Sequence, residues 1–320
     1  MKKVFITGGA GFIGSEVSNL FASNCHHVVA FDSFETYLVP NSGSQFPSPT
    51  SRLKASDYLK ITRGNILNKY HLEHAILDQE PDILVHAASL PLANIAINMT
   101  EEAYDSILTS TLNLLEIIRR NKLKTKFIFL SSSMVYGDFK KTPVKEDHPT
   151  NPKEIYGTLK LMAEKLIEAY GKRHDISYSI IRPSAVYGPG DRNARVIFKF
   201  ARAAIDGTSI KVDGDGENLA DFTNIKDIGR AIYLCAISNN TDGKIYNATT
   251  GASVSLNDVL RVLREEYPNL DVCYGEKPDY VPLRGTLDIS QLRADAGYQP
   301  ETSTLDGIRK YLHHLQANIF

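Results

Sequence analysis

The sequence predicts an α/β fold, in which a doubly wound parallel sheet is joined to a smaller, appended C-terminal domain. Short apolar strands alternate with amphipathic helical stretches as far as Arg182, which is typical of a parallel sheet with crossover helices. The first strand runs directly into a glycine-rich turn and a helix. Beyond Gly188 the composition changes to loops rich in Gly, Asp and Asn. With 320 residues, 42% of them hydrophobic, the chain can form a large domain and a smaller one.

Charge and cysteine usage limit the classes of partner. The formal net charge is −1, which gives no reason to expect nucleic acid or an anionic membrane as a partner. Three cysteines without metal-ligand spacing predict no metal site and fit a reducing cytoplasm. No run approaches the roughly 18 apolar residues of a membrane span. We therefore expect a cytoplasmic protein that binds anionic ligands with local cations.

The glycine turn predicts a dinucleotide site. Residues 4–6 form an apolar strand, and Gly8, Gly11 and Gly14 follow at three-residue spacing. Such glycines let backbone N–H groups approach a pyrophosphate at a helix N-terminus. A second strand over 28–31 ends in Asp32, where an acid accepts hydrogen bonds from the adenosine ribose. Its carboxylate would repel a 2′-phosphate, and no Arg or Lys follows until Arg52, so NAD is favoured over NADP.

The next elements continue the alternation. Residues 33–56 read as a long exposed loop beside the cofactor, and strands are predicted over 58–62, 83–86, 127–130 and 178–182. His86 is interpreted as a packed strand residue rather than a base. A helix is predicted over 101–120, with Ile107, Leu108, Leu112, Leu115 and Ile118 on one face.

A serine, a tyrosine and a lysine provide the candidate chemistry. The fifth strand ends in Ser131, Ser132 and Ser133, and a helix then carries Tyr156 and Lys160 one turn apart on one face. A free phenol has a pKa of roughly 10, and a neighbouring ammonium would favour the phenolate as a proton acceptor. The same spacing also occurs in helices as a solvated pair, and the glycine turn favours the catalytic interpretation here.

Several sequence motifs follow one another in order along the chain. They are Thr7-Gly8-Gly9-Ala10-Gly11-Phe12-Ile13-Gly14, Asp32, Gly64-Asn65-Ile66, His86-Ala87-Ala88, Ser131 to Gly137, Tyr156 with Lys160, Arg182 to Gly190, and Gly214-Asp215-Gly216. With these motifs the chain resembles, over essentially its whole length, the extended short-chain dehydrogenases/reductases of the NAD-dependent nucleotide-sugar epimerase/dehydratase family.

The resemblance implies a domain plan and a set of ligand contacts. A Rossmann-type NAD-binding domain would span 1–182 with returns near 224–248, and a substrate-binding lobe would span 183–223 and 249–320. The helices over 101–120 and after Tyr156 would form a homodimer's four-helix bundle. The implied cofactor contacts are Gly8, Gly11, Phe12, Ile13, Gly14, Asp32, Ser33, Asn65, Ile66, Ala87, Ala88, Ser89, Tyr156, Lys160 and Pro183. The implied contacts to a nucleotide-diphosphate sugar are Ser132, Ser133, Arg195, Val212 and Arg284.

The resemblance also implies a reaction at C4 of the sugar. Tyr156 would be the base, Lys160 would hold the nicotinamide ribose, and Ser132 would bind the C4 oxygen. Dehydratases carry Asp-Glu or Ser-Glu at the next two positions, whereas this chain has Ser133 and Met134, and a thioether cannot transfer protons. This favours a 4-epimerase. The alternatives are a C4 dehydrogenase or ketosugar reductase, and, as a second class, a non-catalytic NAD-binding regulator.

Phosphate recognition departs from the family pattern. Ala185 and Ala220 stand where relatives usually carry polar pyrophosphate contacts. Arg284 matches a family arginine and is the expected phosphate ligand. For Arg192 and Arg195 a phosphate contact and a plain surface charge are both open.

Overall fold

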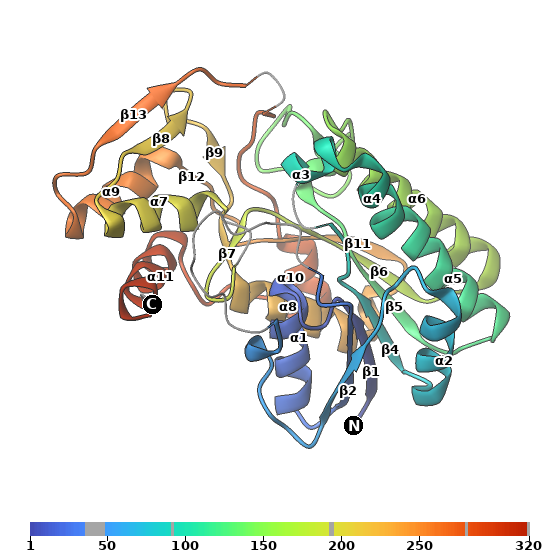
Figure 1. The fold of residues 1–320 in the computed structure, drawn as a ribbon. Coiled ribbons are helices and arrows are strands. Elements are labelled where there is room, and N and C mark those ends of the chain that lie inside the picture. The colour runs from blue at the N-terminus through green and yellow to red at the C-terminus, as the bar shows by residue number, and fades with distance from the viewer. Residues whose placement is uncertain (36–48, 91–92, 192–194, 279–280, 319–320) are drawn as a thin grey trace.

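A seven-stranded parallel sheet organises the computed structural model, which describes residues 1–35, 49–90, 93–191, 195–278 and 281–318 (Figure 1). Its strand order is β3-β2-β1-β4-β5-β6-β11. The strands are β1 (Lys3–Thr7), β2 (His27–Asp32), β3 (Leu59–Arg63), β4 (Ile83–His86), β5 (Lys126–Leu130), β6 (Tyr178–Pro183) and β11 (Lys244–Ala248). The order reverses between β1 and β4, so a crevice opens at their carboxyl ends, where ligands of such sheets bind.

Helices cover both faces of the sheet, as expected for strands that are apolar on both sides (Figure 1). One face packs against α1 (Phe12–Ser23), α8 (Ile225–Ile237) and α10 (Ser290–Ala296). The other packs against α2 (Lys69–Gln79), α3 (Ala93–Asn98), α4 (Thr100–Tyr104), η2 (Asp105–Thr109), α5 (Ser110–Arg120) and α6 (Ile155–His174). This confirms the doubly wound α/β fold.

A smaller lobe has its own apolar core (Figure 1). It contains three two-stranded sheets, β7–β10, β9–β12 and β8–β13. Its elements are β7 (Val186–Tyr187), α7 (Val196–Asp206), β8 (Ile210–Asp213), β9 (Leu219–Ala220), β10 (Thr223–Asn224), β12 (Val254–Ser255), α9 (Leu256–Glu266), β13 (Val272–Gly275) and α11 (Thr304–Ala317). The described residues also include the 3₁₀ helices η1 (Pro49–Arg52), η3 (Ser133–Tyr136) and η4 (Asn239–Thr241). The helix α10 lies within the range predicted for the lobe, 249–320, yet it packs on the sheet. The predicted domain bounds remain a prediction.

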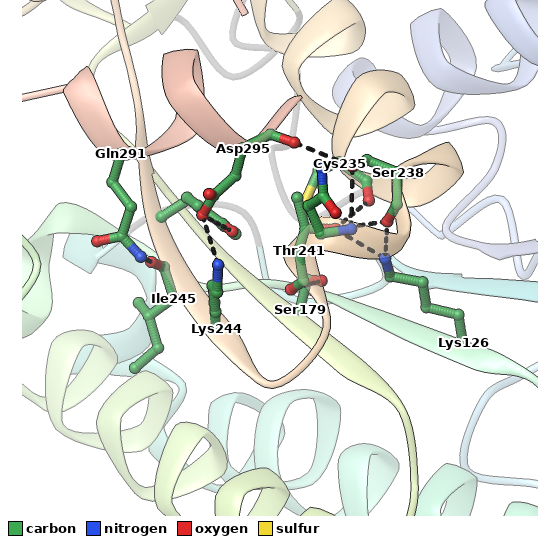
Figure 2. Close-up of polar contacts among 11 residues, drawn as sticks. Lys126, Ser179, Cys235, Ser238, Thr241, Lys244, Ile245, Gln291 and Asp295 are labelled. Atoms are coloured by element: carbon green, nitrogen blue, oxygen red, sulfur yellow. Dashed lines mark hydrogen bonds and ion pairs between the residues drawn. The ribbon is translucent and has the colours of Figure 1, made fainter. Parts of the chain in front are cut away.

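The edge strand β11 is held to the sheet by polar side chains as well as by its ladder (Figure 2). Lys126 Nζ of β5 donates to Ser238 O (2.5 Å) and Thr241 Oγ1 (2.7 Å) in the turn before β11. Lys244 Nζ forms an ion pair with Asp295 of α10 at 2.9 Å. The return of the chain from the lobe to the sheet is thereby fixed. Within the described ranges, no helix is long and apolar enough to cross a bilayer.

The helix predicted over 101–120 is interrupted. It consists of α4, the π-helical segment η2 and α5 in direct succession. Of the predicted apolar face, Ile107, Leu115 and Ile118 are buried, whereas Leu112 is 41% exposed. The extra residue in the π turn rotates the face, because each such turn adds about one residue to the helical ladder. Of the loop predicted over 33–56, residues 36–48 lie outside the described residues, and the described part contains the 3₁₀ helix η1.

Candidate active site

The glycine turn between β1 and α1 is tight enough to require glycine. Gly8 has φ +67°, and its carbonyl accepts the N–H of Gly11 at 2.9 Å. A Cβ on Gly8 would lie 2.6 Å from the nitrogen of Ala88, and one on Gly14 would lie 1.9 Å from the Gly8 oxygen. The N-cap residue of α1 is Gly11, which has no side chain to cap the first N–H groups of the helix. This cradle fits a dinucleotide pyrophosphate.

Asp32 lies at the carboxyl end of β2, beside the same turn. Its carboxylate accepts the N–H of Ala10 (2.9 Å) and of Phe34 (2.8 Å). Arg52 also reaches the turn, because its Nη1 donates to Ala10 O (3.0 Å) while its Nε donates to Gly190 O (2.9 Å). The expectation that no cation lies near this turn is therefore wrong. Arg52, at the end of η1, is distant from the glycine turn in sequence but contacts it in the folded chain.

The remaining predicted cofactor contacts line the carboxyl ends of the strands. Ser33 follows β2, Asn65 and Ile66 follow β3, Ala87 to Ser89 follow β4, and Pro183 ends β6. The Asn65 Oδ1 accepts the N–H of Leu67 at 2.8 Å, so its acceptor closes a local turn. Ser89 Oγ donates to Leu90 O at 2.9 Å. Their roles as cofactor ligands remain predictions.

Ser132, Tyr156 and Lys160 come together where β5 meets α6. Ser132 caps η3 by accepting the N–H of Met134 at 3.1 Å. Lys160 is buried, donates to Leu130 O at 2.7 Å, and lies with its Nζ 5.7 Å from the centroid of the Tyr156 ring. The predicted placement of the lysine one turn along the face of the tyrosine is observed.

Burial dominates the electrostatics of this pair. It raises the pKa of Tyr156 to about 12, while the charge of Arg195 and the hydroxyls of Ser89 and Ser132 lower it. Burial lowers the pKa of Lys160 to about 7, with Glu164 acting in the opposite direction. The expectation that Lys160 alone would bring the phenol towards neutrality is not met, since burial disfavours both charged forms.

Arg284 meets the loop that follows Ser132. Its Nη1 donates to Ser133 Oγ at 2.7 Å, and its Nη2 contacts the Met134 sulfur. Burial lowers the pKa of Arg284 to about 10, opposed by the charge of Glu154. The arginine predicted for phosphate binding thus lies against Ser133 and Met134, the two residues on which the expectation against a dehydratase rests.

The other predicted substrate contacts lie in the lobe. Arg195 precedes α7, forms an ion pair with Asp191 at 2.6 Å, and lies 5.3 Å from the centroid of the Phe12 ring at the cofactor turn. Val212 has its side chain in the lobe core, so only its main chain could contact a substrate. Arg192 lies outside the described residues.

Two serines, one in the helical interruption η2 and one at the start of α5, were missed by sequence reasoning. Ser106 Oγ accepts the N–H of Leu90 at 3.1 Å, which ties η2 to the segment after β4. Ser110 Oγ is hydrogen-bonded to His86 Nε2 at 3.0 Å, and Thr7 Oγ1 to His86 Nδ1 at 2.8 Å. Burial lowers the pKa of His86 to about 3, so it is a neutral, packed residue. The available signal was the presence of these two serines within the helical stretch predicted over 101–120.

Comparisons with known proteins decide the family. A model of the NAD dependent epimerase/dehydratase family matches residues 4–249. The chain belongs to this family. It is 27% identical to a protein of Methanocaldococcus jannaschii named putative UDP-glucose 4-epimerase, covering 98% of this chain and 99% of that protein. The UDP-glucuronic acid 4-epimerase of Bacillus cereus, solved with UDP-glucuronic acid and NAD, is 27% identical with a TM-score of 0.89, covering 99% of this chain and 100% of that one.

Family membership fixes the cofactor but leaves the reaction open. NAD is the cofactor of this epimerase/dehydratase family member. An Arabidopsis thaliana trifunctional enzyme with UDP-glucose 4,6-dehydratase activity in its name is 26% identical over 99% of this chain, which spans 47% of that protein. Epimerases and dehydratases are thus about equally similar. In the part of the chain that the structure describes, no three His, Cys, Asp or Glu side chains could hold a metal ion.

Proposed function

We propose that the chain is a nucleotide-sugar 4-epimerase that oxidises C4 transiently to a 4-keto intermediate and reduces it on the opposite face. The observation that carries the proposal is the Ser133-Met134 pair next to the catalytic serine, covered by the guanidinium of Arg284. Ser133 and Arg284 supply hydrogen bonds and a positive charge beside Ser132, but neither they nor Met134 exchange protons near neutral pH.

Tyr156 is the group that accepts the proton of the C4 hydroxyl. Ser132 hydrogen-bonds the C4 oxygen, and Lys160 holds the nicotinamide ribose and stabilises the phenolate. NAD, when bound, accepts the hydride of C4 and returns it. The α1 N-terminus and Asp32 hold the other half of the dinucleotide. For epimerisation the nucleotide must stay bound while the keto sugar turns over, so firm phosphate binding by Arg284 supports this function.

Elimination of water is disfavoured by the same geometry. A dehydratase needs an acid and a base near C6, and the Met134 thioether is neither. Arg284 stays protonated near neutrality even though burial lowers its pKa to about 10. The nearby Glu154 carboxylate accepts the N–H groups of Tyr156 and Gly157, both at 2.8 Å, and so caps α6.

Two other functions remain as alternatives. A C4 dehydrogenase or ketosugar reductase could use the same trio, but would change the oxidation state of the cofactor once per turnover. A non-catalytic NAD-binding regulator is disfavoured because Ser132, Tyr156 and Lys160 lie together. Net formation of reduced cofactor would identify the dehydrogenase.

A homodimer through α4, α5 and α6 is the proposed assembly. Their outer face carries three exposed apolar side chains, Tyr104 (48%), Leu112 (41%) and Met162 (46%). A hollow of about 690 Å³ runs between α5 and α6, lined by Leu108, Leu161 and Leu166 among others. A second copy of these helices would cover the hollow and form the four-helix bundle that the resemblance implies.

The test is a panel of nucleotide hexoses incubated with the purified protein, with product mass and sugar configuration both followed. We expect a product of unchanged mass and inverted C4 configuration, and no accumulation of reduced cofactor. A product lighter by one water would show a dehydratase instead. The panel would also identify the nucleotide and the sugar.

A further inference from the structure

A buried ion pair lies directly behind the catalytic residues. The Glu164 carboxylate accepts Arg182 Nε at 2.9 Å and Nη2 at 2.6 Å, a bidentate pair whose side chains are 0% and 3% exposed. The Arg182 guanidinium also lies 4.7 Å from the centroid of the Tyr136 ring. Glu164 lies two helical turns after Tyr156 and one turn after Lys160, so the three side chains share one face of α6. The proposed chemistry does not use this pair.

Glu164 and Lys160 connect α6 by hydrogen bonds to the consecutive residues Leu130 and Ser131 at the end of β5. Lys160 Nζ donates to the carbonyl of Leu130 at 2.7 Å. The hydroxyl of the next residue, Ser131, donates to the Glu164 carboxylate and is itself buried. Ser132 follows immediately. The distance between its hydroxyl and the phenol of Tyr156 therefore depends on two contacts that are one helical turn apart.

Glu164 is also the acidic group whose charge acts on the pKa of Lys160. Burial lowers the pKa of Lys160, and the charge of Glu164 raises it. Among the described residues, the other titratable groups near the two are Tyr156 on α6, His86 on β4, Tyr136 in η3 and Arg182 on β6. Glu146 lies near Arg182 and Tyr136, while Arg195 and Glu154 face the phenol. Burial keeps His86 and Tyr136 neutral, since it lowers the pKa of the first to about 3 and raises that of the second to about 12.

We propose that Glu164, held by Arg182, is a positioning residue: it fixes Ser132 against Tyr156 through Ser131, and its negative charge stabilises the ammonium of Lys160. Arg182 is needed because a lone buried carboxylate would take up a proton and lose that charge. The inference rests on the proposed function only in taking Tyr156 as the proton acceptor.

Three variants separate the two parts of this role in the NAD-loaded protein. Glu164→Gln removes a negative charge, so Tyr156 and Lys160 both lose protons more easily, and both limbs of the pH profile of kcat should move to lower pH by about one unit. Glu164→Asp keeps the charge and should leave the limbs in place. Ser131→Ala removes the hydrogen bond from the Ser131 hydroxyl to Glu164 but no charge. It should lower kcat roughly tenfold without moving the limbs of the pH profile.

A second readout needs no substrate. The ultraviolet absorbance of the Tyr156 phenolate, taken as wild type minus Tyr156→Phe with NAD bound, should titrate at lower pH in Glu164→Gln. If Glu164→Gln does not fold, Glu164→Gln/Arg182→Gln removes the unpaired cation and should shift in the same direction. Unmoved titrations in the charge variants, or a shift in Ser131→Ala, would overturn the inference. If the wild type yields no sugar product, the proposed function fails, while the absorbance titration still decides on Glu164.

Discussion

A phenol that is partly buried in an apolar site releases its proton only if its environment compensates. At Tyr156 burial acts against ionisation, and the neighbouring hydroxyls and Arg195 act for it. Tyr156→Phe removes the proton acceptor while changing little volume, so we expect kcat to fall by at least about a hundredfold. NAD should still copurify, because the glycine turn is untouched. Near-normal turnover, measured by product configuration, would mean that another group takes the C4 proton.

Arg284 is the residue on which substrate affinity should depend most. Ala185 and Ala220 stand where the family resemblance implies polar contacts to the pyrophosphate, and a hydrogen bond to a charged group contributes about 1.5–3 kcal/mol. We therefore expect Arg284→Ala to weaken nucleotide-sugar binding by roughly ten- to a hundredfold. Calorimetric titration would measure it, with NAD affinity as an internal check.

Arg264→Ala, on the exposed side of α9, is the matched control and should bind substrate normally. If Arg284→Ala also binds normally while Arg195→Ala loses affinity, phosphate recognition lies on the substrate loop. The pose of the sugar would then differ, and the epimerase proposal would weaken.

At the scale of elements, we expect the β1-turn-α1-β2 unit to determine which dinucleotide binds. Asp32 would lie against the adenosine ribose, where its charge repels a 2′-phosphate. We expect NAD to bind at least about tenfold more tightly than NADP, and Asp32→Asn to narrow that difference because the repulsion is lost. Titrating the stripped protein with both cofactors measures this. Equal or tighter binding of NADP by the wild type would show that Arg52, which lies at the same turn, accommodates the extra phosphate.

Elements with a continuous apolar run or a glycine requirement could be predicted from the sequence. The strand predicted over 83–86 is observed with the same ends, and the strand predicted over 127–130 begins one residue earlier. The π-helical η2 could not be predicted, because Ser106 in η2 and the adjoining Ser110 of α5 are hydrogen-bonded to Leu90 and His86 from another part of the chain. Arg52 and Glu164 were missed for the same reason, since their partners are distant in sequence.

At the scale of the whole molecule, the site lies where the sheet and the lobe meet. The cofactor cradle and the serine-tyrosine-lysine trio come from the sheet, whereas Arg284 comes from the segment after β13. In the proposed function, this division separates hydride and proton transfer from phosphate binding by Arg284. Local sequence patterns predicted where the glycine turn and the trio lie in the fold, because each motif is contiguous. The position of Arg284 depends on how the lobe packs against the sheet, and short sequence motifs contain little information about that packing.

The proposed dimer can be tested through the outer face of α5 and α6. A stable interface buries about 800 Å² per partner, and its apolar centre would not tolerate an unpaired charge. We expect the wild type to sediment as a dimer, and Leu112→Glu and Met162→Glu to shift it towards monomer while the fold is retained. Tyr70→Glu provides the matched control, because Tyr70 on α2 is 87% exposed and lies outside the α4–α6 face. A dimer that persists in both interface variants would place the contact on another surface, and a monomeric wild type at micromolar concentration would rule out this assembly.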